Sequence, residues 1–488
     1  MIRLQELLFG SSDKSESARL ARMEKKGIIH KIAPRIYTSN FEEAPGVIIR
    51  RNWFRILSNH YPGILLSHRS ALEFAPADGG HVFLTHTYTR NIRLPGLTIH
   101  FLEGPTKQEN DNVFYENLFA SQEARAMLEN MQETRSAGEL PKTLSTEQIE
   151  ERLDLLIRSR GEDGINQLRD RARELAPVLG MEKEFIKLNK LVSDLLTTGS
   201  SKNLRSPLAI ARSLGEPFDP ERIKIFETLY GALSTKTFPS YKDRNESIRS
   251  YRNFAFFESY FSNYIEGTEF TVSEALQIIQ SETPLPDRDE DSHDVLGTYQ
   301  IVSDRKEMRV TPESANGLLQ LLRSRHATLL RARLAKKPGQ FKDKNNRAGN
   351  TEFVDWQLVA GTLKKGFDWY TLLKDPFAKA VYIMFLISEV HPFLDGNGRI
   401  ARVMMNAELS SKGLSKIIIP TVFREDYMGA LRKLTRQHDP APYIRMLLRT
   451  FEFSYNVYGE SEEKMEMYLM ACNAFDDPEI SKLIILPQ

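Results

Sequence analysis

Residues 391–402 read His391-Pro392-Phe393-Leu394-Asp395-Gly396-Asn397-Gly398-Arg399-Ile400-Ala401-Arg402. The residues just before them, 377–390, form a nearly continuous apolar run that is too long for an ordinary strand and predicts a buried central helix. His391 should end that helix, because a residue before proline disfavours the α region. Helical periodicity resumes over residues 399–410, so the sequence predicts two helices joined by an Asp-Gly-Asn-Gly turn.

A helix that begins after a glycine-rich turn is predicted to bind an anion, because unpaired backbone N–H groups and the helix dipole point at the ligand. Gly396 and Gly398 allow close approach of a phosphate and tolerate positive φ, and Asn397 adds side-chain donors. Arg399 and Arg402 are three residues apart, so they share a helix face and can clamp phosphates. The turn therefore indicates a polyphosphate site.

Two further residues supply chemistry at this turn. Asp395 is its only carboxylate, and one carboxylate together with phosphate oxygens is a common way of holding Mg²⁺. His391 can accept a proton near neutral pH, which suits a general base for a hydroxyl nucleophile. The predicted chemistry is transfer of a phosphate-containing group to a hydroxyl.

Three competing interpretations are weaker. Residues 396–401 fit a dinucleotide-binding G-x-G-x-x-A pattern, with 417–423 as a second strand, but the first glycine of that pattern follows directly on a strand. No G-x-x-x-x-G-K-[ST] pattern exists, which excludes a P-loop nucleotidase. A capped turn around a buried histidine leaves the two arginines and the acid unexplained.

Residues 391–402 match without gaps the HPFx[DE]GNGRxxR signature of Fic (filamentation induced by cAMP) proteins, and the resemblance extends over residues 205–450. It implies a helical domain that transfers AMP from ATP to a Ser, Thr or Tyr hydroxyl of a target protein and releases pyrophosphate. By this resemblance His391 is the base, Phe393 anchors the loop and Asp395 holds Mg²⁺. The nucleotide-binding residues would be Gly396, Asn397, Gly398, Arg399 and Arg402, with Asn406 and Tyr427 as weaker candidates.

Residues 262–267, Ser-Asn-Tyr-Ile-Glu-Gly, resemble the [ST]xxxE[GN] inhibitory helix of self-inhibited Fic proteins. Glu258, Ser262 and Glu266 are four apart and line one stripe of a helix expected near 254–267, which Gly267 should stop. The resemblance implies that Glu266 pairs with Arg402 and occupies the place of the ATP γ-phosphate. In relatives such a glutamate can also support removal of AMP.

Other parts of the chain are predicted from pattern and position. Residues 341–354 lie where Fic proteins place a β-hairpin flap that aligns a target by strand pairing; Asn345-Asn346 and Gly349-Asn350 are candidate turns, and a plain surface loop is the alternative. Residues 113–200 have helical periodicity, notably 147–158 and 182–196, and end in a polar break at 197–202; they are predicted as a helical connector. Residues 451–488 are predicted as a helical tail.

Residues 1–103 combine a helix at 15–26 with a short hairpin at 28–38 and a further helix at 65–72. This arrangement resembles the winged-helix domain of abortive-infection antitoxin regulators, which implies DNA binding. Basic residues that would contact phosphates cluster on the first helix and hairpin: Arg19, Arg22, Lys25, Lys26, Lys31 and Arg35. A winged fold used for protein contacts is the alternative.

The composition is compatible with this organisation. The 488 residues should form roughly three domains. Lys+Arg (66) balance Asp+Glu (65), so no global charge favours nucleic acid or a membrane surface. A single cysteine, no apolar leader and no apolar run of membrane-spanning length predict a cytoplasmic protein without a membrane partner.

The sequence therefore predicts a mainly α protein: a winged-helix-like α+β module followed by a helical Fic domain with a small β-hairpin flap. Its predicted function is ATP- and Mg²⁺-dependent protein adenylyltransferase, acting on a target protein or on itself and inhibited by Glu266. Two alternatives stay open. One is a toxin–antitoxin type DNA-binding regulator whose Fic domain senses nucleotide, and the other is a Fic enzyme that uses another nucleotide donor.

Overall fold

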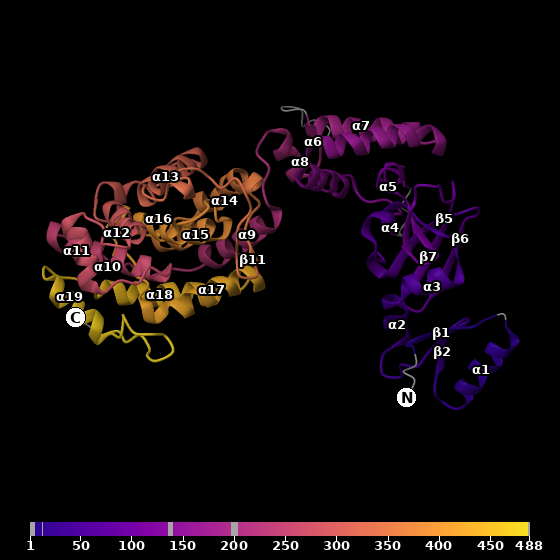
Figure 1. Ribbon diagram of the computed structural model, residues 1–488, viewed down its shortest axis with the longest axis horizontal. Helices are drawn as coiled ribbons and strands as arrows, with labels where there is room; N and C mark the ends of the chain where they lie inside the picture. Colours follow the sequence, from indigo (N-terminus) through magenta and orange to yellow (C-terminus); the bar gives the residue numbers. More distant parts are fainter. Residues whose placement is uncertain (1–4, 12, 135–139, 197–203, 487–488) are drawn as a thin grey trace. The chain divides into compact units, whose positions relative to one another are not determined.

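The computed structural model describes residues 5–11, 13–134, 140–196 and 204–486. The chain is mainly α-helical, as the sequence predicted, and it divides into two compact units, Met1–Leu214 and Gly215–Gln488 (Figure 1). Within the described ranges no helix has the length and apolar character needed to cross a membrane. Each unit is described separately.

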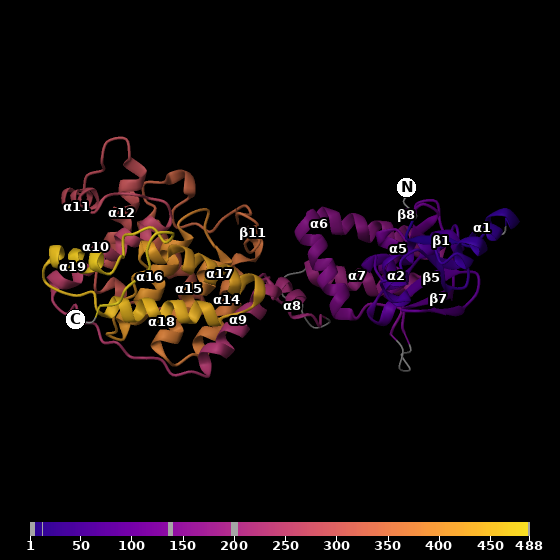
Figure 2. The same cartoon turned by 90° about the horizontal axis from the view of Figure 1, so that it is seen from below.

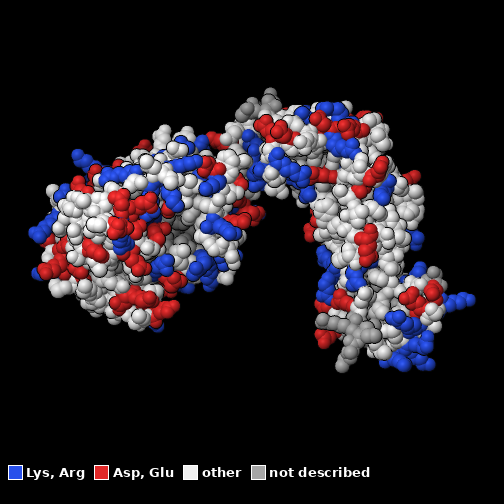
Figure 3. Space-filling model, viewed as in Figure 1, with Lys and Arg blue, Asp and Glu red and all other residues white. Residues whose placement is uncertain are grey.

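The first unit begins with a three-stranded antiparallel sheet and one helix. The strands are β1 (Leu7–Phe9), β2 (His30–Ala33) and β3 (Ile36–Thr38) in the order β1-β3-β2, and α1 spans Lys14–Lys25. The predicted helix and hairpin are thus present. The basic residues expected there are exposed, and Figure 3 shows Lys and Arg side chains gathered over α1 and the hairpin. The winged-helix assignment itself stays a prediction.

A second sheet, which the sequence analysis missed, follows in the same unit. Its order is β6-β7-β5-β4-β9-β8, with β5–β7 and β4–β9 parallel and the remaining neighbours antiparallel. The strands are β4 (Leu65–Leu66), β5 (His81–His86), β6 (Arg90–Leu94), β7 (Leu97–Glu103), β8 (Asn112–Tyr115) and β9 (Leu118–Ala120).

Two expectations are corrected by this sheet. Residues 65–72, expected as one helix, form β4 and then the short helix α4 (His68–Glu73), because Leu65 and Leu66 are buried between two neighbouring strands. A short apolar run has no periodicity that separates strand from helix. The connector expected as helical at 113–200 begins with β8 and β9, so a boundary at 103 would cut through the sheet.

Helices complete the first unit; the first two pack with the strands in one apolar core, and the later ones share a second core. They are α2 (Pro45–Arg51), α3 (Trp53–His60), α5 (Glu123–Asn130), α6 (Thr146–Leu179, interrupted at Gly161), α7 (Glu182–Leu196) and α8 (Pro207–Ser213). The helices predicted at 147–158 and 182–196 are present, whereas the break predicted at 197–202 lies outside the described residues. Leu204 and Ala209 belong to this core, so the second unit begins later than the predicted residue 205.

The second unit is built from helices and one small hairpin. The helices are α9 (Pro220–Ser234), α10 (Ile248–Ile265), α11 (Val272–Ser281), α12 (Asp289–Val302), α13 (Ala315–Leu329), α14 (Val359–Leu372), α15 (Pro376–Val390), α16 (Asn397–Ser411), α17 (Arg424–Gln437), α18 (Ala441–Tyr455) and α19 (Glu462–Ala471); the hairpin pairs β10 (Arg347–Ala348) with β11 (Thr351–Glu352). In two perpendicular views α15 and α16 lie among the other helices (Figures 1 and 2).

The C-terminal residues are part of this unit rather than a separate tail. Val457, Met465, Leu469 and Leu483 are buried in the same core as α15 and α16. Helix α19 ends at Ala471, and the described residues after it are not helical. The predicted helical tail is therefore helical only in its first half.

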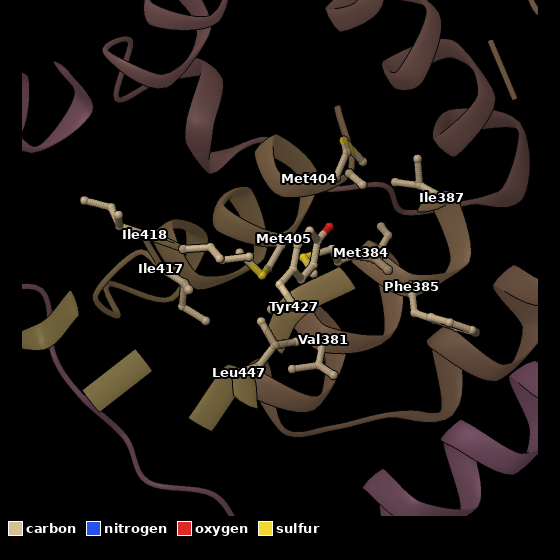
Figure 4. Packing of buried hydrophobic residues seen from close by; sticks show 14 of the residues in the cluster. Val381, Met384, Phe385, Ile387, Met404, Met405, Ile417, Ile418, Tyr427 and Leu447 are labelled. Atoms are coloured by element: carbon tan, nitrogen blue, oxygen red, sulfur yellow. The ribbon is translucent and has the colours of Figure 1, made fainter. Parts of the chain in front are cut away.

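Helices α15 and α16 carry the sequence motif between them. Asp375 caps α15 by accepting the Ala378 N–H at 2.9 Å, and the helix ends at His391, which has a left-handed backbone (φ 51°) before Pro392. Most side chains of both helices are buried, and Figure 4 shows Met384 of α15 close to Met405 of α16. Because both helices are buried almost all round, the six-residue connection between them has little freedom.

A buried ion pair joins α10 to the segment after α16. Lys416 Nζ lies 2.5 Å from Glu258 Oε2, and both side chains are at most 5% exposed. Asn406 Nδ2 donates to Glu258 Oε1 at 2.8 Å and to the Ile417 carbonyl at 2.9 Å. Burial raises the pKa of Glu258 even though Lys416 and Asn406 lower it. This network holds α10 against α16.

Replacing Lys416 by Met should lower the free energy of unfolding of the second unit by about 3–5 kcal/mol, because a buried carboxylate loses its partner. The loss should be larger at pH 8 than at pH 5, since a carboxyl with a raised pKa costs stability when it must ionise. Urea denaturation would measure it. The double variant Glu258→Gln/Lys416→Met should recover most of the loss, and a single variant as stable as wild type would contradict the pairing.

Candidate active site

The imidazole of His391 is held at the end of α15 with one nitrogen free. Its Nδ1 lies 3.2 Å from the Ser388 carbonyl oxygen, which can only accept, so Nδ1 carries the proton and Nε2 keeps its lone pair. Burial lowers the pKa of His391 to about 4, with Lys342 adding to the effect, while Glu266 and Asp395 oppose it. At neutral pH the group is an uncharged imidazole able to accept a proton.

Gly396 and Gly398, at the start of α16, require glycine on different physical grounds. Gly396 has φ 73°, a left-handed conformation that other residues rarely adopt. Gly398 is helical, so the expectation of positive φ applies to Gly396 alone. A Cβ on Gly398 would lie 2.2 Å from Glu266 Oε1, so the glycine leaves room for a carboxylate against the helix start.

Asn397 differs from its predicted role as a donor to phosphate. Its Oδ1 accepts from the Phe393 N–H at 2.8 Å and its Nδ2 donates to the Phe393 carbonyl at 2.9 Å. The side-chain amide is thus used within the loop, and it fixes the turn rather than facing a ligand. Its backbone N–H remains one of the unpaired donors of the first helical turn.

The loop rests on an aromatic support that sequence reasoning missed. The rings of Phe393 and His326 are parallel, with centroids 3.7 Å apart, and Phe393 is fully buried. His326 accepts from the Gly339 N–H at Nδ1 and therefore donates from Nε2 to the Asp395 carbonyl at 3.0 Å. No motif in the sequence marks His326, because its role depends on how α13 packs.

The carboxylate of Asp395 is partly exposed next to the helix start. Oδ1 accepts from the Gly396 N–H at 2.7 Å, and Lys336 Nζ lies 3.3 Å from Oδ2. Burial raises the pKa of Asp395, but Arg399, the Gly396 N–H and Lys336 together lower it by more than burial raises it. The group is therefore ionised at neutral pH. Among the described residues no cluster of three His, Cys, Asp or Glu could hold a metal ion. An ionised carboxylate beside an anion site fits a cation that takes its remaining ligands from phosphate and water.

Arg402 is paired with the end of α10. Its Nε donates to Ser262 Oγ at 3.0 Å, and its Nη2 donates to the Ser262 carbonyl at 2.8 Å and to Glu266 Oε1 at 2.7 Å. The third nitrogen, Nη1, is buried without a hydrogen-bond partner. Burial raises the pKa of Glu266, but Arg402 and Arg399 lower it more, so the carboxylate is ionised. Gly267, with φ 93°, ends the helix as predicted.

Arg399 differs from the prediction that both arginines clamp phosphates. Its Nη1 lies 2.5 Å from Asp294 Oδ2 on α12 and donates to Asn263 Oδ1 at 3.3 Å. Arg333 Nη2 lies 2.8 Å from the same Asp294 oxygen. Arg399 therefore ties α16 to α10 and α12. This contact could not be predicted from the sequence, because Asp294 is more than a hundred residues before Arg399.

A cavity of about 490 Å³ opens beside these groups. That volume lies within the range of small-molecule sites, about 300–1,000 Å³. Its walls come from the flap, the last turn of α15, the first turns of α16, α17 and the end of α10: Glu266, Ala348, Gly349, Asn350, Thr351, Phe353, Ser388, Glu389, His391, Gly398, Arg402, Tyr427, Met428, Leu431, Arg432, Thr435 and Arg436.

The predicted flap is a hairpin with Gly349-Asn350 as its two-residue turn. The other candidate turn, Asn345-Asn346, instead lies at its base, where Asn346 Nδ2 donates to the Phe393 carbonyl at 2.9 Å. Of the weaker candidates, Tyr427 is buried and lines the cavity, whereas Asn406 belongs to the Glu258 network described above.

Residues 318–409 match the Fic/DOC family, and they include the flap, α15 and most of α13 and α16. The buried helix pair, the histidine at the end of α15 and the glycine start of α16 all lie inside this match. This part of the chain is a Fic domain. Glu266 and the rest of α10 lie outside the matched residues.

Curated relatives carry the same domain. The protein adenylyltransferase Fic of Drosophila willistoni is 24% identical over 254 residues, which are 50% of this chain and 48% of that protein. The protein adenylyltransferase fic-1 of Caenorhabditis elegans is 25% identical over 215 residues, 43% of this chain and 42% of that protein. The chain thus spans about half the length, or less, of the curated relatives it matches.

A solved structure of Fic-1 (residues 134–508) from C. elegans aligns with 67% of this chain and 92% of its own, at 18% identity and a TM-score of 0.36. The assignment of the Fic domain rests on the sequence match and on the geometry of the site.

The geometry predicts that His391 stays neutral down to about pH 5. Because burial holds its pKa near 4, the imidazole should protonate two or more pH units below an exposed histidine. Nuclear magnetic resonance titration of histidine-labelled protein would measure this, with His391→Ala used to assign the signal. A midpoint of 6 or above would contradict the buried position.

Proposed function

We propose that this chain is a protein adenylyltransferase that transfers AMP from ATP to a hydroxyl side chain of a target protein and is inhibited by its own Glu266. The observation that carries the proposal is the free Nε2 of a neutral His391 on the wall of a nucleotide-sized cavity, beside the start of α16. The names of the curated relatives support the same activity.

In this proposal His391 accepts the proton of the target hydroxyl at Nε2 while the hydroxyl oxygen bonds to the α-phosphorus. The bond from that phosphorus to the β-phosphate oxygen breaks, and pyrophosphate leaves. The N–H groups of Asn397 and Gly398 at the helix start and the guanidinium of Arg402 would stabilise the charge on the phosphates. Arg399 would act indirectly, because its ion pair with Asp294 fixes the position of α16.

Asp395 is the residue that would hold Mg²⁺ in this site. The ion, when bound, would neutralise charge on the α- and β-phosphates. The ionised, partly exposed carboxylate next to Gly396 supports that role.

Self-inhibition is supported by the place that Glu266 takes. Its carboxylate lies against Gly398 and pairs with Arg402, so it meets both groups that would bind a phosphate chain. An anion entering there would meet the negative charge of Glu266 and the guanidinium of Arg402, which is already paired. Access to the productive site would therefore require Glu266 to leave Arg402.

Replacing Glu266 by Gly should raise AMP transfer by about 10–100-fold, because the charge-assisted hydrogen bond that is lost contributes about 1.5–3 kcal/mol. The measurement is incorporation of labelled AMP into the chain itself or into protein from a cell extract, with ATP and Mg²⁺. GTP and UTP in parallel would test the alternative of another donor.

The matched control is Glu266→Gly/His391→Ala, in which transfer should fall by about 10²–10⁴-fold while ATP binding persists. Label transferred equally by both variants would contradict the role of the base. Equal transfer by wild type and Glu266→Gly would contradict inhibition and leave the transferase role standing.

A second proposed function is DNA binding by the first unit, supported by the exposed cationic face of α1 and the hairpin. Affinity for duplex DNA should fall steeply as salt rises, because phosphate contacts release counterions. Arg19→Glu/Arg22→Glu should weaken it by at least about tenfold in a gel shift, whereas Glu24→Gln on the same helix should not. Binding that ignores both salt and the double substitution would refute the proposal.

A further inference from the structure

One contact at the site is not accounted for by the proposed chemistry. The ring of Phe353 lies parallel to the imidazole of His391, with centroids 3.6 Å apart and an angle of 7° between the planes. Phe353 directly follows β11, so it belongs to the foot of the flap rather than to its tip at Gly349-Asn350. It also lines the cavity.

Hydrogen bonds join the base of the flap to the loop that follows His391. The Lys342 N–H donates to the Pro392 carbonyl at 2.9 Å, and Asn346 Nδ2 donates to the Phe393 carbonyl at 2.9 Å. Lys342 Nζ, almost fully buried, donates to Asn346 Oδ1 at 2.7 Å. These bonds bind the hairpin base to residues one and two after His391, so the position of Phe353 relative to the imidazole is set within the resting protein.

The imidazole ring of His391 is held by one hydrogen bond, which does not by itself fix the plane of the ring. A bond from Nδ1 to the Ser388 carbonyl fixes one ring atom, but the ring can still tilt about that point. A parallel aromatic ring restricts the tilt and excludes water from one face of the imidazole. Both effects bear on the direction of Nε2 and on the charge of the ring.

The charged groups that face His391 do not by themselves keep it neutral. Lys342 disfavours the protonated ring, while Glu266 and Asp395 favour it. The main influence is burial, and the ring of Phe353, stacked on one face of the imidazole, contributes to it.

We propose that Phe353 is a positioning residue for His391: it fixes the plane of the imidazole and keeps its face dry, so that the flap organises the base before any target binds. The proposal deepens the proposed transferase function and rests on it for its catalytic consequence. Its structural part, the contact in the resting protein, can be tested without activity.

The test compares Phe353→Ala, Phe353→Tyr and Glu352→Ala. Glu352 is an exposed neighbour on β11, which makes its variant the matched control. The resting protein is examined first, by nuclear magnetic resonance titration of His391 in the full chain without nucleotide. Phe353→Ala should move the midpoint from about 4 toward 6.5, while the other two variants should keep it low.

The same substitutions in the Glu266→Gly background give the catalytic readout. Phe353→Ala should lower kcat by about 10–100-fold with little change in the KM for ATP, since a misplaced base affects the chemical step. The pH at which kcat falls on the acid side of the profile should also rise, because a base with a raised pKa becomes protonated at a higher pH. Phe353→Tyr should restore both the rate and the pH profile.

An unchanged His391 midpoint in Phe353→Ala, or an unchanged pH profile in an active enzyme, overturns the proposal. A raised midpoint in a protein that shows no transfer in any variant supports the contact and counts against the proposed function instead. The two failures are therefore distinguishable.

Discussion

The packing of α15 against α16 is the constraint on which the site depends. Both helices are buried on nearly all sides, so their ends cannot shift without opening the core of the second unit. The connection must turn sharply within six residues, which requires left-handed backbone at His391 and at Gly396. A histidine at the first of these turns and unpaired N–H groups after the second are thereby placed beside one cavity.

Polar contacts then hold this connection from three directions. Asn397 bonds back to Phe393, His326 bonds to Asp395 from α13, and Asn346 bonds to Phe393 from the flap. These contacts satisfy two backbone carbonyls of the loop: Phe393 accepts from both asparagines, and Asp395 accepts from His326. The result is a loop held in one conformation, in which Nε2 of His391 makes no hydrogen bond within the protein.

The end of α10 adds an opposing charge to this prepared site. Glu266 lies against Gly398 and pairs with Arg402, while the Glu258 network anchors the same helix eight residues earlier. Because the helix is anchored, the carboxylate can leave Arg402 only by movement of its own side chain or of the last turn.

The sequence by itself determined the local elements and the identity of the reactive groups. The apolar run before His391, the proline after it and the two glycines predicted the helix–turn–helix, and the four-residue spacing of Glu258, Ser262 and Glu266 predicted one helical stripe. These features follow from backbone sterics and helical period, which act over a few residues.

Only the tertiary structure decided which groups meet. Arg399 faces Asp294 rather than the cavity, Asn397 is used within the loop, and His326 and Phe353 contact the motif from distant segments. In the first unit the six-stranded sheet went unpredicted, because strands as short as Leu65–Leu66 are defined by their neighbours rather than by their own pattern. Contacts between distant segments leave no periodic pattern in the local sequence, so they cannot be predicted from short stretches of the chain.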